Sequence, residues 1–229
     1  RKNLEQQKDD FIGIASHELK TPVAVMKGYV AMIEKLLRKK GSLQEADLLS
    51  KVNQQIVRIT TLINDLLDVT KIESGTIKFD QQVFDFDRMV AEIIDSMQHI
   101  SDHKLIQKGS TGQKVFGDKD RIGQVIINLI SNAVKYSPEA DTVIIESGVQ
   151  DSVIKLVVKD FGIGISEKNI DKIFNRFYRI REESGNKSSG LGLGLYISAE
   201  IIKRHAGNML VESKEGEGSV FGFTLPVIE

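Results

Sequence analysis

One histidine in this chain has neighbours that would suit a nucleophile. His17 stands in the segment Ser-His-Glu-Leu-Lys-Thr-Pro, where Glu18 directly follows it. A neutral imidazole is a good nucleophile near pH 7, and a neighbouring carboxylate can hold the second ring N–H. Taken alone, an ordinary surface histidine beside a glutamate is the more frequent explanation. His99, His103 and His205 have no such motif around them, so we expect ordinary roles for these three.

Two asparagines four residues apart could bind a metal–phosphate group. Asn128 and Asn132 would share one face of a helix, and the same segment ends in Lys135 and Tyr136. Amide oxygens are acceptable ligands for Mg²⁺, which usually keeps waters and substrate phosphates as its other ligands. Lys135 adds a positive charge for phosphate. The alternative is an amphipathic helix with polar residues on its wet side.

An aspartate followed by two glycines could recognise a flat base. Asp160 comes directly after a predicted strand, and Gly162 and Gly164 follow it. A carboxylate at a strand end can accept a hydrogen bond from an exocyclic amine such as that of adenine. The glycines would allow the backbone to approach the ring closely. A plain Asp-x-Gly turn remains the alternative.

A second glycine-rich segment precedes a predicted helix. Gly190, Gly192 and Gly194 alternate with leucines, and glycines at a helix N-terminus expose backbone N–H groups to phosphates. The segment is not the dinucleotide fingerprint, because Leu195 occupies the position of its third glycine. The polar stretch 181–189 just before it predicts a lid over a nucleotide, although a plain surface loop would have the same composition.

The first part of the chain predicts a helical hairpin that would carry His17. Gly41 follows three cations and predicts the end of one helix, and Ser42 with Glu45 forms a capping-box pattern for the next. Apolar residues spaced three and four apart mark both helices. In the first helix these are Phe11, Ile14, Leu19, Met26, Tyr29, Ile33 and Leu36. In the second they are Leu49, Val52, Ile56, Ile59, Ile63 and Leu66, widened by Leu62 and Val69. A hairpin with such wide stripes needs a partner, so we expect a homodimer with a four-helix bundle.

The second part of the chain predicts strands mixed with helices. We expect strand hairpins at 143–149 with 153–158 and at 209–212 with 220–225, and helices at about 89–100, 120–136 and 193–205. These elements favour an α/β sandwich, so the predicted fold class is α+β. The boundary should fall near residues 73–78, which divides the chain into domains 1–74 and 75–229.

The bulk composition excludes several classes of protein. The 229 residues carry a net charge of −1, so no basic field argues for a nucleic acid partner. The absence of cysteine excludes disulfides and thiolate metal sites. No apolar run is long enough to cross a bilayer. The chain begins at Arg1, so we expect a cytoplasmic fragment, with membrane attachment only through a sensor upstream of it.

The order and spacing of these motifs resemble the transmitter core of two-component sensor histidine kinases. The segment from His17 to Pro22 resembles the H box of the family's dimerisation and histidine-phosphotransfer domain. Four further segments resemble boxes of its Bergerat-type ATP-binding domain. They are residues 128–136 for the N box, 160–164 for G1, 174–179 for F and 190–195 for G2. The resemblance covers nearly the whole chain.

The resemblance implies a role for each matching position. His17 would accept the phosphoryl group, Glu18 would be the acid–base residue, and Thr21 would support phosphatase activity toward the partner. Asn132 would bind Mg²⁺, and Asp160 would accept from the adenine amine. The other implied nucleotide-binding residues are Asn128, Lys135, Tyr136, Gly162, Gly164, Arg176, Arg179, Gly190, Gly192, Leu193 and Gly194. ATP and Mg²⁺ are the implied cofactors, and a second copy of the chain and the receiver domain of a response regulator are the implied partners.

Two other functions share part of this pattern. An ATPase of the gyrase, Hsp90 and MutL group has the same nucleotide pocket but needs no phosphoacceptor histidine. A dimeric scaffold could bind a nucleotide without using it. Phosphate on His17 that is stable to alkali and labile to acid would distinguish a kinase from both.

Overall fold

The computed structural model describes the backbone of residues 2–180 and 191–227, and within these ranges the side chains from residue 19 onward. The chain divides into two compact units, Arg1–Ile77 and Lys78–Glu229. The division falls after Ile77, three residues beyond the predicted division after residue 74.

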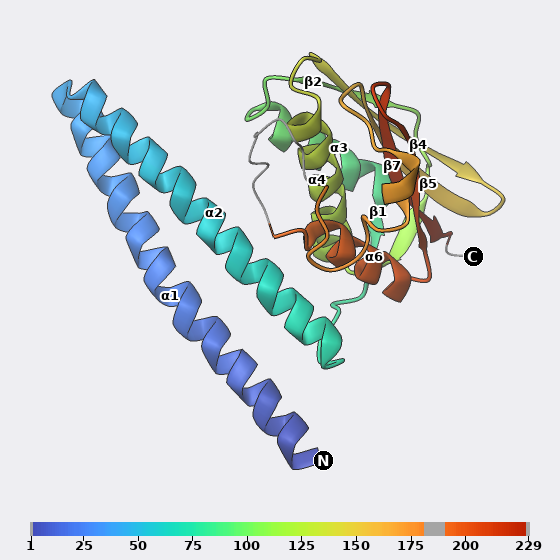
Figure 1. Cartoon of the computed structure of the whole chain (residues 1–229), viewed down its shortest axis with the longest axis horizontal. Coiled ribbons are helices and arrows are strands. Elements are labelled where there is room, and N and C mark those ends of the chain that lie inside the picture. Colours follow the sequence, from blue (N-terminus) through green and yellow to red (C-terminus); the bar gives the residue numbers. More distant parts are fainter. Residues whose placement is uncertain (1, 181–190, 228–229) are drawn as a thin grey trace. The chain divides into compact units, whose positions relative to one another are not determined.

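The first unit is a hairpin of two long helices, α1 (Lys2–Lys40) and α2 (Leu43–Glu73) (Figure 1). Gly41 joins them with a positive φ of 78°. The capping box expected at Ser42 and Glu45 does not form, because the Ser42 side chain makes no capping hydrogen bond. In the short connection Ser42 has φ −79° and ψ 69°, which is not the extended conformation that lets an N-cap side chain reach the first turn.

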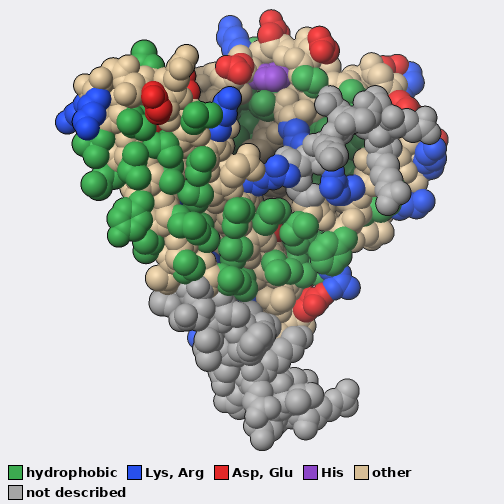
Figure 2. Space-filling view, turned by 60° about the vertical axis from the view of Figure 1, so that its left-hand side comes forward, with side chains coloured by type: hydrophobic (Ala, Val, Ile, Leu, Met, Phe, Trp, Pro, Cys, Tyr) green, Lys and Arg blue, Asp and Glu red, His purple; other side chains and the backbone are tan. Residues whose placement is uncertain are grey.

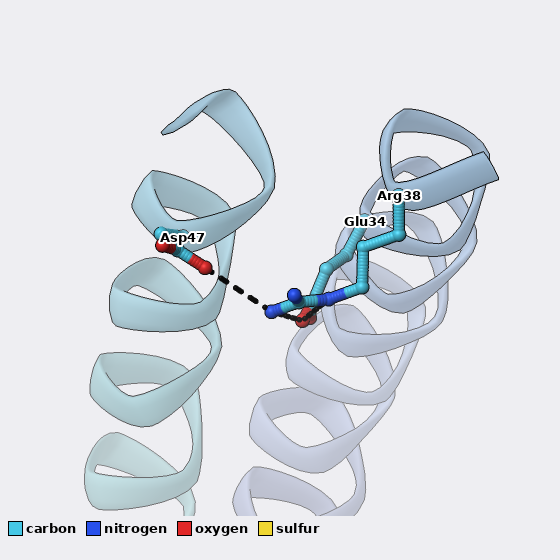
Figure 3. A network of polar contacts seen from close by, with 3 residues as sticks. All are labelled: Glu34, Arg38 and Asp47. Atoms are coloured by element: carbon cyan, nitrogen blue, oxygen red, sulfur yellow. Dashed lines mark hydrogen bonds and ion pairs between the residues drawn. The ribbon is translucent and has the colours of Figure 1, made fainter. Parts of the chain in front are cut away.

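A polar contact links the two helices next to the turn. Arg38 of α1 lies between Glu34 on its own helix, 3.1 Å from the guanidinium, and Asp47 on α2, 3.3 Å away (Figure 3). All three residues lie near the surface, so the contact contributes little stability. It does define which turns of the antiparallel helices lie opposite one another.

The apolar stripe predicted for α2 divides into two faces. Ile56 is buried in the hairpin, and Leu49 and Ile63 are half-buried. The alternating members Val52, Ile59 and Leu66 keep 45%, 47% and 46% of their surface exposed. Exposed apolar residues also run along α1, at Leu19, Met26, Tyr29, Ile33 and Leu36. Figure 2 shows a broad band of apolar side chains on the molecular surface, in the view that brings the hairpin forward.

The second unit is a five-stranded sheet with helices on one face (Figure 1). The strand order is β2-β4-β5-β7-β6, with β2 parallel to β4 and the other pairs antiparallel. The strands are β2 (Lys104–Lys108), β4 (Thr142–Gln150), β5 (Val153–Asp160), β6 (Asn208–Lys214) and β7 (Gly218–Pro226). The helices are α3 (Phe86–Gln98), α4 (Lys119–Tyr136), α5 (Glu167–Ile170) and α6 (Gly194–Arg204). A separate ribbon pairs β1 (Gln82–Asp85) with β3 (Lys114–Gly117).

Alternation along the strands explains why the helices cover one face. On β5, Ile154, Leu156 and Val158 are buried while Lys155 and Lys159 are exposed, as a sheet with one wet face requires. Both predicted strand hairpins and the three predicted helices are present, and the α+β fold class is confirmed. The strands β1, β2 and β3 were not predicted, because they are short and carry several charged or polar residues.

Among the residues described, no helix combines the length and the apolar character needed to cross a lipid bilayer.

Candidate active site

The two amides of the predicted metal–phosphate motif lie on α4. Asn128 and Asn132 are both half-buried. The Asn128 Nδ2 donates to the Ser198 hydroxyl of α6 over 3.0 Å. A Cβ on Gly194 would lie 2.6 Å from the Asn128 Oδ1, so the first residue of α6 packs directly against this amide. The predicted N-box and G2-box segments are therefore neighbours.

Asp160 is a buried carboxylate at the end of β5, with only 3% of its surface exposed. Its Oδ1 accepts from the backbone N–H of Gly162 at 2.9 Å and of Ser219 at 3.2 Å. Burial raises the pKa of Asp160 above its ordinary value, and the hydrogen bonds from Gly162 and Ser219 partly oppose this shift. Oδ2 accepts neither of the two backbone bonds, and no described cation pairs with the carboxylate.

The loop after Asp160 packs against the last turn of α4. The backbone N–H of Ile163 donates to the Tyr136 carbonyl at 3.2 Å. A Cβ on Gly162 would lie 2.0 Å from that same carbonyl oxygen, so only glycine permits this approach. Gly164 has a positive φ of 65°. The predicted G1 loop thus begins at Asp160 and lies beside the end of the N-box helix.

The segment that resembles the F box contacts the start of the G2 segment. The backbone N–H of Phe177 donates to the Gly192 carbonyl at 3.1 Å. Phe177 has a φ of +60°, which is unusual for a residue with a side chain of this size, and the residue is 59% exposed. Leu193 is buried and precedes α6.

The predicted cations and the tyrosine lie at the surface of the unit. The Lys135 ammonium is 4.7 Å from the centre of the Tyr136 ring and 3.2 Å from its hydroxyl. The Arg176 guanidinium lies 5.7 Å from the Tyr196 ring. Arg176 and Arg179 are exposed. Lys135 and the two arginines are accessible to a charged ligand.

Several predicted residues lie outside what the structure describes. Gly190 and the expected lid at 181–189 are among them. His17 and Glu18 lie on α1, but their side chains are not described. Thr21, one turn further along α1, has an exposed side chain.

The sequence reasoning missed two polar residues that contact the predicted set. Ser219 donates to Asp160 across 59 positions in the sequence, and Ser198 accepts from Asn128 across 70. No local spacing marks either serine. Only the pairing of β5 with β7, which sets Asp160 opposite Ser219, brings the first pair together.

Two family models match the chain. Residues 117–229 match the model described as "Histidine kinase-, DNA gyrase B-, and HSP90-like ATPase". Residues 7–75 match the model described as "His Kinase A (phospho-acceptor) domain". Together the two matches include most of the hairpin and the sheet unit from the end of β3 onward.

Curated relatives are similar over the length of this chain. The sensor histidine kinase WalK of Bacillus subtilis is 32% identical over 240 residues, which is 100% of this chain and 38% of that protein. The sensor protein kinase WalK of Staphylococcus saprophyticus is 33% identical over 99% of this chain and 38% of its own length. The chain thus spans well under half the length of these relatives.

Solved structures share the fold. The Acinetobacter baumannii histidine kinase AdeS superposes with a TM-score of 0.62 at 26% identity, over 93% of this chain and 98% of that one. Full-length ShkA in complex with AMPPNP superposes with a TM-score of 0.74, over 95% of this chain and 46% of that one. At 22% identity the second likeness concerns the fold alone.

Proposed function

Because this chain belongs to the sensor histidine kinases of two-component systems, we propose that it phosphorylates its own His17 from Mg-ATP. The phosphoryl group then passes to an aspartate of a response regulator. The match to a phospho-acceptor domain over residues 7–75 favours this function over an ATPase of the gyrase or Hsp90 group, which shares only the nucleotide unit.

One observation within the sheet unit supports nucleotide binding above the others. Asp160 is buried without a described cation, yet two backbone N–H groups keep its carboxylate in place. A buried carboxylate of this kind is suited to an external donor, such as the exocyclic amine of adenine. Gly162 and Gly164 would line the same pocket.

The residues of α4 fit a magnesium–phosphate group. The described chain contains no cluster of three or more His, Asp or Glu side chains that could hold a metal ion by itself. Mg²⁺ would therefore depend on the nucleotide phosphates together with the half-buried amide of Asn132, and bound Mg²⁺ would neutralise phosphate charge. Asn128 would hold the N-terminal end of α6 beside it.

The phosphate tail would lie near the exposed cations and the start of α6. Lys135, Arg176 and Arg179 supply positive charge, and the backbone N–H groups of Gly192 and Gly194 can donate to phosphate oxygens. Gly190, Leu193 and Tyr136 complete the proposed nucleotide-binding set.

In the proposed reaction, His17 is the nucleophile. A ring nitrogen of His17 attacks the γ-phosphorus, the bond from phosphorus to the β,γ-bridging oxygen breaks, and ADP leaves with the electron pair. Glu18 orients the ring through its other nitrogen and takes up the proton released. A response-regulator aspartate then attacks the phosphohistidine. Thr21, one helical turn from His17, would support the phosphatase reaction, in which water attacks the aspartyl phosphate of the regulator and releases inorganic phosphate.

The exposed apolar face of the hairpin supports a homodimer. Val52, Ile59 and Leu66 on α2 repeat every seven residues, as do Leu19, Met26 and Ile33 on α1. Such stripes pair in a four-helix bundle. We further propose that the chain is the cytoplasmic part of a longer sensor.

The decisive experiment is incorporation of γ-labelled phosphate from Mg-ATP into the native chain and a His17→Gln variant. We expect label on the native chain alone, stable to alkali and lost in acid. Hydrolysis of ATP without label would instead favour the ATPase function. Nucleotide binding with neither activity would favour a scaffold.

A further inference from the structure

The connection between the two units is held on both sides by contacts within each unit. On the hairpin side, the backbone N–H groups of Thr76 and Ile77 both donate to the Lys71 carbonyl, at 3.0 and 3.2 Å. These bonds keep the chain folded against the end of α2 as far as Ile77. The hairpin side therefore leaves little free linker.

On the side of the sheet unit, the chain is held from Phe79 onward. The Phe79 ring meets the His205 ring edge to face, with 5.2 Å between the ring centres. The Asp80 backbone N–H donates to the Asp118 Oδ2 at 2.9 Å, while the Oδ1 of that carboxylate accepts from the Arg121 N–H in the first turn of α4. We call Phe79, Asp80, Asp118 and His205 the linker anchor. Within the described chain, the exposed Lys78 between the two sides makes no hydrogen bond.

His205 is at the centre of the linker anchor because both ring nitrogens are used. Nδ1 lies 2.7 Å from the Ile201 carbonyl, which can only accept, so Nδ1 carries the proton. Nε2 accepts from the Asp118 backbone N–H at 2.9 Å. The ring also requires Gly117, since a Cβ there would lie 2.6 Å from the His205 Cδ2.

The linker anchor stands at the far ends of the two helices proposed to bind nucleotide. Asp118 is the N-cap of α4, whose later turns carry Asn128 and Asn132. His205 is the C-cap of α6, whose first residue is Gly194. The anchor thus fixes the chain connection to the nucleotide unit without contacting the nucleotide-binding residues.

From these contacts we propose that His205 is a positioning residue for phosphoryl transfer, because it confines the hinge between the units to Lys78. This proposal rests on the kinase function proposed above. A shorter free segment keeps ATP at a higher effective concentration near His17. Releasing the anchor would free the chain as far as β1 and lower the rate of autophosphorylation, while the affinity for nucleotide would stay the same.

The test uses variants of the native homodimer that release the anchor in different ways. Phe79→Ala removes the ring contact, His205→Leu removes the acceptor for Asp118, and His205→Gln restores an acceptor. Insertion of two glycines after Lys78 lengthens the hinge without touching the anchor. Asp87→Ala is the matched control, since among the described residues the Asp87 side chain bonds only to the Thr111–Gly112 turn of the same unit.

Three quantities are measured for each variant: the rate of His17 labelling at saturating ATP, the Kd for ADP, and amide hydrogen exchange at Asp80. We expect Phe79→Ala, His205→Leu and the insertion to slow labelling by roughly five- to tenfold, with Kd within about twofold of native. Asp80 should lose protection in His205→Leu and regain part of it in His205→Gln. Asp87→Ala should label at the native rate.

An unchanged labelling rate in both Phe79→Ala and the insertion variant would overturn the proposal. A loss of ADP affinity as large as the loss of labelling rate would also overturn it, because His205 would then stabilise the nucleotide pocket. If His205→Leu fails to fold, Phe79→Ala and the insertion still decide. A native chain that takes no label rejects the kinase function itself. Protection at Asp80 in that case would still report that the anchor forms.

Discussion

At the scale of single residues, burial and hydrogen bonding constrain the roles that the predicted side chains can have. Asp160 has two backbone donors and no described cation, so its charge is stabilised by hydrogen bonds alone. Asn128 donates its Nδ2 to Ser198 and packs beside Gly194. The spacing of the two amides alone does not distinguish a structural asparagine from a metal ligand. The family resemblance assigned Mg²⁺ to Asn132, and this role stays a proposal.

Replacing the Asp160 carboxylate should weaken the binding of adenine nucleotides. Asp160→Asn places an N–H₂ group or a weaker acceptor opposite the adenine amine, and we expect the Kd for ADP to rise by roughly 10- to 100-fold. Calorimetric titration measures it, with Glu146→Gln on the exposed side of β4 as a control. A Kd equal to that of the native chain would remove Asp160 from the binding site.

The raised pKa of Asp160 also predicts a pH dependence of binding. Burial makes the carboxyl take up a proton at a higher pH than an ordinary aspartate, and the protonated form is a poorer acceptor. The affinity for ADP should therefore fall as the solution is acidified, beginning above the ordinary aspartate range. The same titration of Asp160→Asn should lack this component, and an equal slope in both proteins would contradict it.

Gly162 provides a test of the contact between the G1 loop and α4. Gly162→Ala forces a Cβ against the Tyr136 carbonyl, which cannot move without disturbing the end of α4. We expect a loss of about 1–3 kcal/mol in the free energy of unfolding and weaker nucleotide binding. Gly148→Ala is the control, because a Cβ on Gly148 meets nothing within 4 Å. Equal melting temperatures for the two variants would refute the packing argument.

At the scale of elements, helices were easier to predict than short strands. The long apolar periodicities of α1, α2 and α4 indicate helices from local spacing alone. The ribbon of β1 and β3 gave no comparable signal, because each strand has four residues and only part of it is buried. The prediction of a capping box at Ser42 was wrong, because the φ and ψ of Ser42 in the short connection do not let its side chain reach the first turn of α2.

The hairpin contains an acidic residue whose charge opposes folding. Burial, together with the nearby Asp68 charge, raises the pKa of Asp65 to about 6. Because the unfolded chain has a lower pKa, ionisation of Asp65 favours unfolding as the pH rises from about 4 through 6. Asp65→Asn should therefore raise the free energy of unfolding at pH 7.5 by on the order of 1 kcal/mol after allowance for solvent screening, and the melting temperature should rise with it.

The gain from Asp65→Asn should shrink as the pH falls toward 4, because the native carboxyl is then protonated and uncharged. Thermal unfolding followed by circular dichroism at several pH values measures it. Asp47→Asn, at an exposed position on the same helix, is the control variant. A gain that is independent of pH would mean that folding does not raise the pKa of Asp65.

At the scale of the whole molecule, the exposed face of the hairpin is the feature that requires a partner. Ile59→Lys places a charge in the middle of the stripe of Val52, Ile59 and Leu66, and should convert the proposed dimer to monomers. Sedimentation equilibrium measures the mass, and Gln54→Lys on the same helix is the control. A monomeric native chain, or a dimeric Ile59→Lys variant, would contradict this interface.

The order of the motifs, the helical hairpin and the α+β class could all be predicted from the amino-acid sequence. These features depend on the local spacing of apolar and polar residues, which determines the side chains that share one face of a helix or strand. The inward packing of Leu49, Ile56 and Ile63, with Val52, Ile59 and Leu66 left exposed, could be seen only in the folded hairpin. It alone also decided which distant groups meet, because Asp118 contacts His205 across 87 positions through a backbone N–H that every residue but proline carries.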